Sequence, residues 1–240
     1  NWLNSQKALF PYRWSLYSGG HANLDLTKQD WSEDMVRNRE PGTFMLGDSG
    51  GFQIAKGLWE GEWRDPTGPE VAAMWAEVNA KGVELVPQLH PTGDPKTDKN
   101  GNPKYTKVDH PKLYQARLDA AQKKRELVLT WMDTLMDYGM VLDIPAWVER
   151  SPAGRKATGI ESYQQAVNAT RLNNEYFIKH RNGNCKFLNV LQGSDWDTAE
   201  QWYQGVKEFS DNKVWGDKAA EGWAFGGVNM CKMDITLKRI

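Results

Sequence analysis

The sequence predicts an α/β protein built on a parallel sheet. A (β/α)8 barrel, of which this chain holds only part, is favoured, and an open sheet is the alternative. Short apolar strands alternate with helical segments, and each strand ends in polar or glycine residues. Right-handed crossovers would place all these ends on one side of the sheet. A complete barrel takes about 250 residues. This chain has 240 and also contains an N-terminal arm and an insertion, so we expect the last strands to be absent.

The first expected strand, residues 44–48, ends in an acid, a hydroxyl and two glycines. Parallel α/β folds place their chemistry at this end of a strand, which makes Asp48 and Ser49 candidate site residues. Adjacent glycines let the backbone approach a bound group closely. The alternative is that Asp48 or Ser49 simply caps the helix that follows.

A helix is predicted at residues 69–81, with Pro69 in its first turn, and a short strand at residues 83–89. Residues 91–109 are rich in Pro, Gly, Asp, Asn and Lys, which is typical of turns. We therefore expect one domain over residues 1–240 that carries an exposed insertion at residues 91–109.

The second half repeats the pattern of strand, polar tip and helix. Gly139 is expected to end a long helix. The expected elements are a helix at residues 110–138, a strand at 140–145, a helix at 160–180, a strand at 187–191, a helix at 198–209 and a strand at 222–225. The polar tips of these strands carry Asp143, Gln192, Gly193, Gly226 and Gly227.

Composition excludes several classes of protein. The net charge is −1, so a globally basic nucleic-acid surface is absent, although residues 96–107 are locally basic. The two cysteines, Cys185 and Cys231, are too few and too far apart for a disulfide framework or a Cys-rich zinc site. No apolar run approaches the ~20 residues that span a bilayer, and the first residues lack a signal-peptide pattern. We therefore expect no metal, no membrane and a reducing compartment.

Taken together, the strand tips offer two carboxylates, an amide and glycine backbone. A carboxylate accepts hydrogen bonds from the ring N–H and amino group of guanine, and an amide donates to its carbonyl oxygen. Phe52 would stack on the ring. Such a site discriminates strongly, because a wrong base leaves buried polar groups unpaired. A carboxylate beside the ring also serves as a general acid or base.

Four segments resemble successive motifs of the guanine transglycosylases, the family of the queuine and archaeosine tRNA-guanine transglycosylases. The resemblance covers about residues 40–230. The segments are Asp48-Ser49-Gly50-Gly51-Phe52-Gln53, Val141-Leu142-Asp143, Val190-Leu191-Gln192-Gly193-Ser194 and Gly222-Trp223-Ala224-Phe225-Gly226-Gly227-Val228.

The resemblance implies a (β/α)8 barrel and a pentosyltransferase reaction that exchanges guanine for a 7-deazaguanine through a covalent intermediate. It implies that Asp48 is catalytic and moves the proton of the base, and that Asp143 accepts from guanine N1–H and the amino group. Gln192 and the Gly227 backbone would hold O6. The substrate-binding set it implies is Ser49, Phe52, Asp143, Gln192, Gly193, Gly226 and Gly227.

The chain also departs from the family. Residues 144–146 replace an acid and a cysteine, and residues 228–230 stand where the family approaches a glutamate that helps to select the base. The nucleophilic aspartate and the zinc site of the family have no counterpart before Ile240. Asp234 is a late candidate nucleophile, but it follows Gly227 too closely. We therefore expect no cofactor in this chain, and the last strands and zinc subdomain elsewhere.

These departures resemble the phage and bacterial DNA-guanine transglycosylases more than the tRNA enzymes. The resemblance implies DNA or tRNA and a 7-deazaguanine base as partners, with DNA favoured. It also implies the cytoplasm of a bacterium or phage-infected cell, and it leaves a homodimer open. Two alternatives remain: a non-catalytic relative that binds nucleic acid or a partner subunit, and an unrelated barrel hydrolase that uses Asp48 and Asp143 as an acid/base pair.

Overall fold

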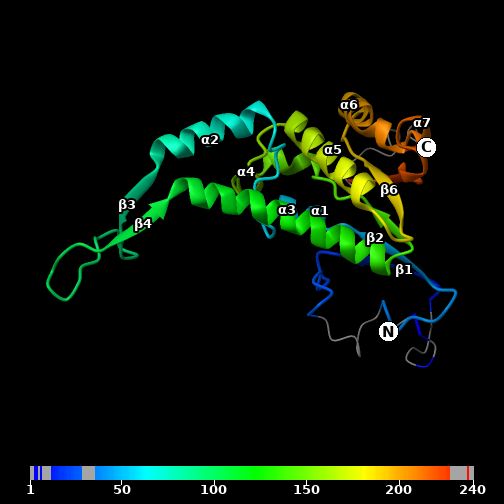
Figure 1. Ribbon diagram of the computed structural model, residues 1–240, viewed down its shortest axis with the longest axis horizontal. Coiled ribbons are helices and arrows are strands. Elements are labelled where there is room, and N and C mark those ends of the chain that lie inside the picture. The colour runs from blue at the N-terminus through cyan, green and yellow to red at the C-terminus, as the bar shows by residue number, and fades with distance from the viewer. Residues whose placement is uncertain (1–2, 5, 7–11, 29–35, 228–236, 238–240) are drawn as a thin grey trace.

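The computed structural model describes residues 3–4, 6, 12–28, 36–227 and 237, and its centre is a five-stranded parallel sheet (Figure 1). The strand order is β1-β2-β5-β6-β7, so each strand of this sheet lies beside the next one along the chain. The strands are β1 Trp14–Ser18, β2 Phe44–Asp48, β5 Tyr138–Met140, β6 Lys186–Leu191 and β7 Gly222–Phe225. The predicted α/β class with parallel strands is confirmed.

Helices fill the connections between these strands. The α-helices are α1 Gly51–Ala55, α2 Pro69–Lys81, α3 His110–Leu135, α4 Pro152–Thr158, α5 Tyr163–His180, α6 Trp196–Val206 and α7 Asn212–Trp215. The 3-10 helices are η1 Ala146–Arg150, η2 Lys207–Ser210 and η3 Gly216–Lys218. The helix predicted at 69–81 and the strand predicted at 222–225 are confirmed to the residue.

One face of the sheet packs against α3, and a pair of glycines allows the close approach. Gly47 of β2 lies beside Gly139 of β5 in the parallel register. A Cβ on Gly47 would lie 2.8 Å from Met136 Cγ, and one on Gly139 would lie 3.0 Å from Met132 Sδ. The two methionines therefore occupy space that side chains on these strands would otherwise fill.

The other face of the sheet is exposed over β1 and β2. Trp14 and Leu16 are 68% and 53% exposed, and Phe44 is 38% exposed. The Trp14 and Phe44 rings stack with their centroids 4.3 Å apart. Because residues two apart on a strand share a face, this apolar surface also leads to Ser18 and Asp48 at the strand ends.

The strand predicted at residues 83–89 is present, but it belongs to a second sheet. β3 (Val83–Pro87) pairs antiparallel with β4 (Tyr105–Asp109). This two-stranded ribbon projects from the body at the end of α2 and α3 (Figure 1). All five residues of β3 are exposed, so its apolar residues do not belong to the main core.

Three expectations about the elements were wrong. Residues 14–18, assigned to an N-terminal arm, form strand β1 of the main sheet. Gly139 does not end a helix: α3 ends at Leu135, and Gly139 lies in β5, where Cys185 Sγ and Phe187 Cε1 would be 3.1 and 3.2 Å from a Cβ. Gly139 is therefore needed for sheet packing. The strand predicted at residues 140–145 was misplaced, because β5 covers Tyr138–Met140 and residues 141–145 are not in a strand.

Replacement of Gly139 by valine should lower the free energy of unfolding by about 1–3 kcal/mol, because the added atoms enter space held by Met132, Cys185 and Phe187. Urea denaturation measures the loss. Leu85→Ala on the exposed ribbon is the control and should change stability by less than about 0.5 kcal/mol. An unchanged unfolding midpoint for the valine variant would contradict this packing.

Candidate active site

The carboxyl ends of the parallel strands meet at one place. Asp48 is the last residue of β2, Asp143 lies three residues beyond β5, and Gln192 follows β6. Gln192 Nε2 donates a hydrogen bond to Asp143 Oδ2, and the charge of Asp48 acts on the Asp143 carboxyl. Gly226, directly after β7, lies so close that a Cβ there would be 3.1 Å from Gln192 Cγ. The structure thus brings together the tips of four strands.

The end of a fifth strand, β1, also belongs to this cluster and contacts Asp48, although it was not predicted from the sequence. Ser18 ends β1, and its Oγ donates a 2.6 Å hydrogen bond to Asp48 Oδ2. The Gly20 N–H in turn donates to Ser18 Oγ at 3.2 Å. The signal was present in the sequence, because residues 14–20 show the same order of strand, hydroxyl and two glycines as residues 44–51.

The Asp143 carboxyl is strongly perturbed by its surroundings. The residue keeps some exposed surface, and protein atoms surround most of its carboxyl. Burial raises the pKa of Asp143 to about 7, the hydrogen bond from Gln192 acts against this, and the charge of Asp48 adds to it. A carboxyl with such a pKa can exchange a proton near neutral pH.

The orientation of the Gln192 amide is fixed from both sides. Its Oε1 accepts a 2.8 Å hydrogen bond from the Ala146 N–H, while its Nε2 donates to Asp143. One Nε2 proton is thereby used, and the other has no partner among the described residues. Gln192 therefore presents a donor beside the carboxyl of Asp143.

The two glycines of the first motif are required by close packing. Gly50 has a φ of 85°, a conformation that favours glycine. A Cβ on Gly51 would lie 2.3 Å from the Asp143 carbonyl oxygen, so no larger residue fits. Ser49 is fully buried, and its hydroxyl interacts with the Asp143 carboxyl and acts to lower the pKa of that group. The alternative role of a side-chain helix cap is wrong, because Gly50 occupies that position.

Phe52 lies on the rim of this cluster. It is 55% exposed, and its ring packs edge-on against Trp147, with the centroids 6.0 Å apart. Its predicted role in stacking on a base stays a prediction. Trp147, on η1 after the Asp143 segment, was not singled out in the sequence, since nothing in its spacing marks it.

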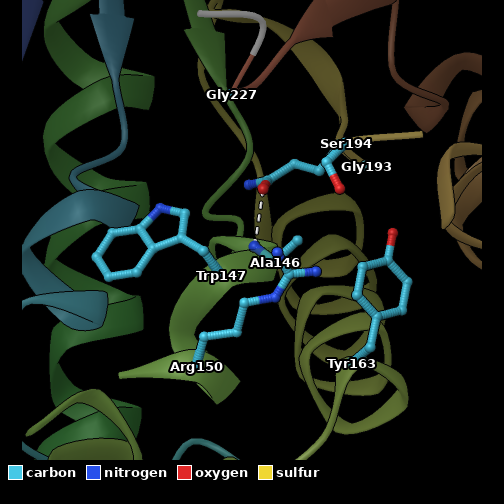
Figure 2. A pocket seen from close by; sticks show the side chains of 8 residues that line it. Ala146, Trp147, Arg150, Tyr163, Gly193, Ser194 and Gly227 are labelled. Carbon is cyan, nitrogen blue, oxygen red and sulfur yellow. Dashed lines mark hydrogen bonds between the residues drawn. The ribbon is translucent and has the colours of Figure 1, made fainter. Parts of the chain in front are cut away.

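A cavity of about 130 Å³ adjoins Gln192 (Figure 2). Figure 2 shows Trp147, Arg150 and Tyr163 around the space beside the hydrogen bond between Gln192 and Ala146. The lining residues are Ala146, Trp147, Arg150, Tyr163, Gln192, Gly193, Ser194 and Gly227. The predicted residues Gly193 and Gly227 therefore lie at the same site as Gln192.

Asp234 and Cys231 lie outside the described residues. Within residues 12–28 and 36–227, no three His, Cys, Asp or Glu side chains group as a metal site would require. Cys185 is buried, and burial raises the pKa of its thiol. The expected absence of a cofactor stays a prediction.

Comparison of the chain with protein-family models, with curated proteins and with solved structures found no match. In the part of the chain that the structure describes, no helix has the length and apolar character to cross a membrane.

Replacement of Asp143 by asparagine should change how stability depends on pH. Because the pKa of Asp143 is raised in the folded state, its contribution to stability is greatest below pH 4 and is lost as the pH rises to about 7. Wild type should therefore lose up to about 1.4 kcal/mol per pH unit relative to Asp143→Asn over this range. Chemical denaturation at several pH values measures it, and parallel stability curves for the two proteins would refute the raised pKa.

Proposed function

We propose that this chain is the base-recognising part of a guanine transglycosylase, which exchanges guanine in a polynucleotide for a 7-deazaguanine. The proposal combines the resemblance of four sequence motifs with the place where those motifs meet. The observation that carries it is the hydrogen bond between Gln192 and Asp143 beside Asp48. Three motifs distant in sequence thus form one cluster of hydrogen-bonding groups.

The donors and acceptors of this cluster match the edge of guanine. An ionised Asp143 would accept from N1–H and the 2-amino group, and the remaining Nε2 proton of Gln192 would donate to O6. Asp48, held by Ser18, would exchange a proton with the base as it leaves or enters. A nucleophilic carboxylate for the sugar would come from outside the described residues.

The proposal includes the finer fold, a (β/α)8 barrel. Consecutive parallel strands in sequential order are the arrangement of such a barrel. β1 and β7 are the outer strands of the described sheet, and the apolar face near β1 is exposed. Further strands that continue the sheet from these edges and close it into a barrel would enclose that face.

DNA is the favoured polymer, with tRNA as the other choice. Within residues 96–107, four lysines stand against a single acid, Asp98. They lie on and beside the ribbon that projects from the body (Figure 1). Lysines on such a projection would contact phosphates, and the affinity for the polymer would then fall with salt.

A hydrolase is the second candidate, because a carboxyl with a pKa near 7 beside a second carboxylate is also a glycosidase arrangement. Hydrolysis of a polysaccharide without any base exchange would favour it. The amide of Gln192 and the close glycine backbone favour base recognition instead, since they add the donors that a purine carbonyl needs.

Guanine binding should weaken as the pH falls below 7. Asp143 must lose its proton to accept from N1–H, so Kd should rise by up to about tenfold per pH unit below its pKa. Calorimetric titration with guanine between about pH 5 and pH 8 measures this. Asp143→Asn should bind weakly with no such dependence, and equal pH dependence in both proteins would argue against the assignment.

Exchange of labelled guanine into DNA and into tRNA tests the activity itself. In the complete enzyme, Asp48→Asn and Asp143→Asn should each abolish exchange while the circular-dichroism spectrum stays unchanged. Exchange at the wild-type rate in both variants would refute the site. Guanine binding by the wild type without exchange into either polymer would instead indicate the non-catalytic relative.

A further inference from the structure

Phe52, Lys56 and Trp147 form an exposed cluster of two aromatic rings and one cation, which we name the rim cluster. Phe52 lies on α1, Lys56 directly follows that helix, and Trp147 lies on η1. The Lys56 ammonium is 5.3 Å from the centroid of Phe52 and 5.8 Å from that of Trp147. Trp147 also lines the cavity beside Gln192 (Figure 2), so the cluster adjoins the candidate site.

The charge of Lys56 is not neutralised by a carboxylate. Lys81 and Lys179 are each paired with a glutamate one helical turn away. Lys56, by contrast, forms neither an ion pair nor a side-chain hydrogen bond with any described residue, and its contacts are the two rings. An ammonium held over aromatic faces keeps its charge available for an anion.

The rings of the cluster are accessible as well. Phe52 is 55% exposed and Trp147 is partly exposed. Aromatic rings beside an unpaired cation are the usual platform for single-stranded nucleic acid, because bases stack on the rings while phosphates contact the cation. Bases within a duplex are stacked on each other and cannot use such a platform.

We propose that the rim cluster binds the nucleotide next to the one whose base enters the site. The base of that neighbour stacks on Trp147, and its phosphate pairs with Lys56. Phe52 keeps its predicted place against the target base. The inference rests on the proposed function, since only a polymer brings a second nucleotide to this rim, and it assigns single-stranded polynucleotide as the form that binds.

The salt dependence of binding distinguishes the phosphate contact of Lys56 from the base contact of Trp147. Fluorescence anisotropy of a labelled single-stranded DNA oligonucleotide, over a series of salt concentrations, gives Kd and its salt slope. Lys56→Gln should weaken binding by about threefold and reduce the slope of log Kd against log salt by about 0.7, the value for one phosphate contact. Trp147→Leu should weaken binding by about fivefold or more and leave the slope unchanged.

The chain contains a matched control for each change. Lys207 lies 5.7 Å from the centroid of Tyr203, the same kind of contact at the far end of α6. Lys207→Gln and Tyr203→Leu should therefore leave both Kd and slope unchanged. The circular-dichroism spectrum of each variant should match wild type, which shows that the fold is retained.

The outcomes distinguish this inference from the proposed function. An unaltered salt slope in Lys56→Gln, or equal affinity for duplex and single-stranded DNA, overturns the inference while guanine binding stands. If the wild type binds guanine but does not bind the oligonucleotide, this inference is overturned and the proposed function stands. If the wild type binds neither guanine nor the oligonucleotide, both the proposed function and this inference are overturned.

Discussion

The enclosed carboxyl of Asp143 is the constraint on which the rest of the site depends. A carboxyl removed from water needs a hydrogen-bond partner or a proton, and here it has the amide of Gln192 and a raised pKa. That amide is in turn held by the Ala146 N–H, and Gly51 and Gly226 leave room for the close approach. The glycines are therefore as necessary to the site as the polar side chains, because bulk at either position would separate the strand tips.

The direction and order of the strands in the sheet bring these polar strand ends together. Parallel strands in sequential order put all their carboxyl ends on one edge, and the packed face is fixed by the glycine pair of β2 and β5 against Met132 and Met136. The opposite face leads from exposed Trp14 and Phe44 to Ser18 and Asp48. The site and the exposed apolar surface over β1 and β2 thus lie on the same side of the sheet. The interior of a barrel would place them in the same way.

Strand tips that combine an acid or amide with glycine were predictable from sequence, because the chemistry and the turn requirement coincide in a few residues. Asp48, Asp143 and Gln192 were found in this way, and the structure brings them together. β1 was missed because no helical pattern follows it in the sequence, although Ser18 ends it as Asp48 ends β2. Gly139 was misassigned because a glycine after a helix pattern is typical of a helix end, and only the packing against Met132 reveals its place in the sheet. Trp147 was missed because its contact between η1 and α1 has no local sequence signal.

A crystal structure of the chain with guanine bound would test the central claim most directly. The account predicts that guanine N1 and the 2-amino nitrogen lie within hydrogen-bond distance of the Asp143 carboxylate, and that O6 accepts from Gln192 Nε2. Guanine bound at another surface, with the contact between Gln192 and Asp143 unchanged and the strand tips empty, would contradict it.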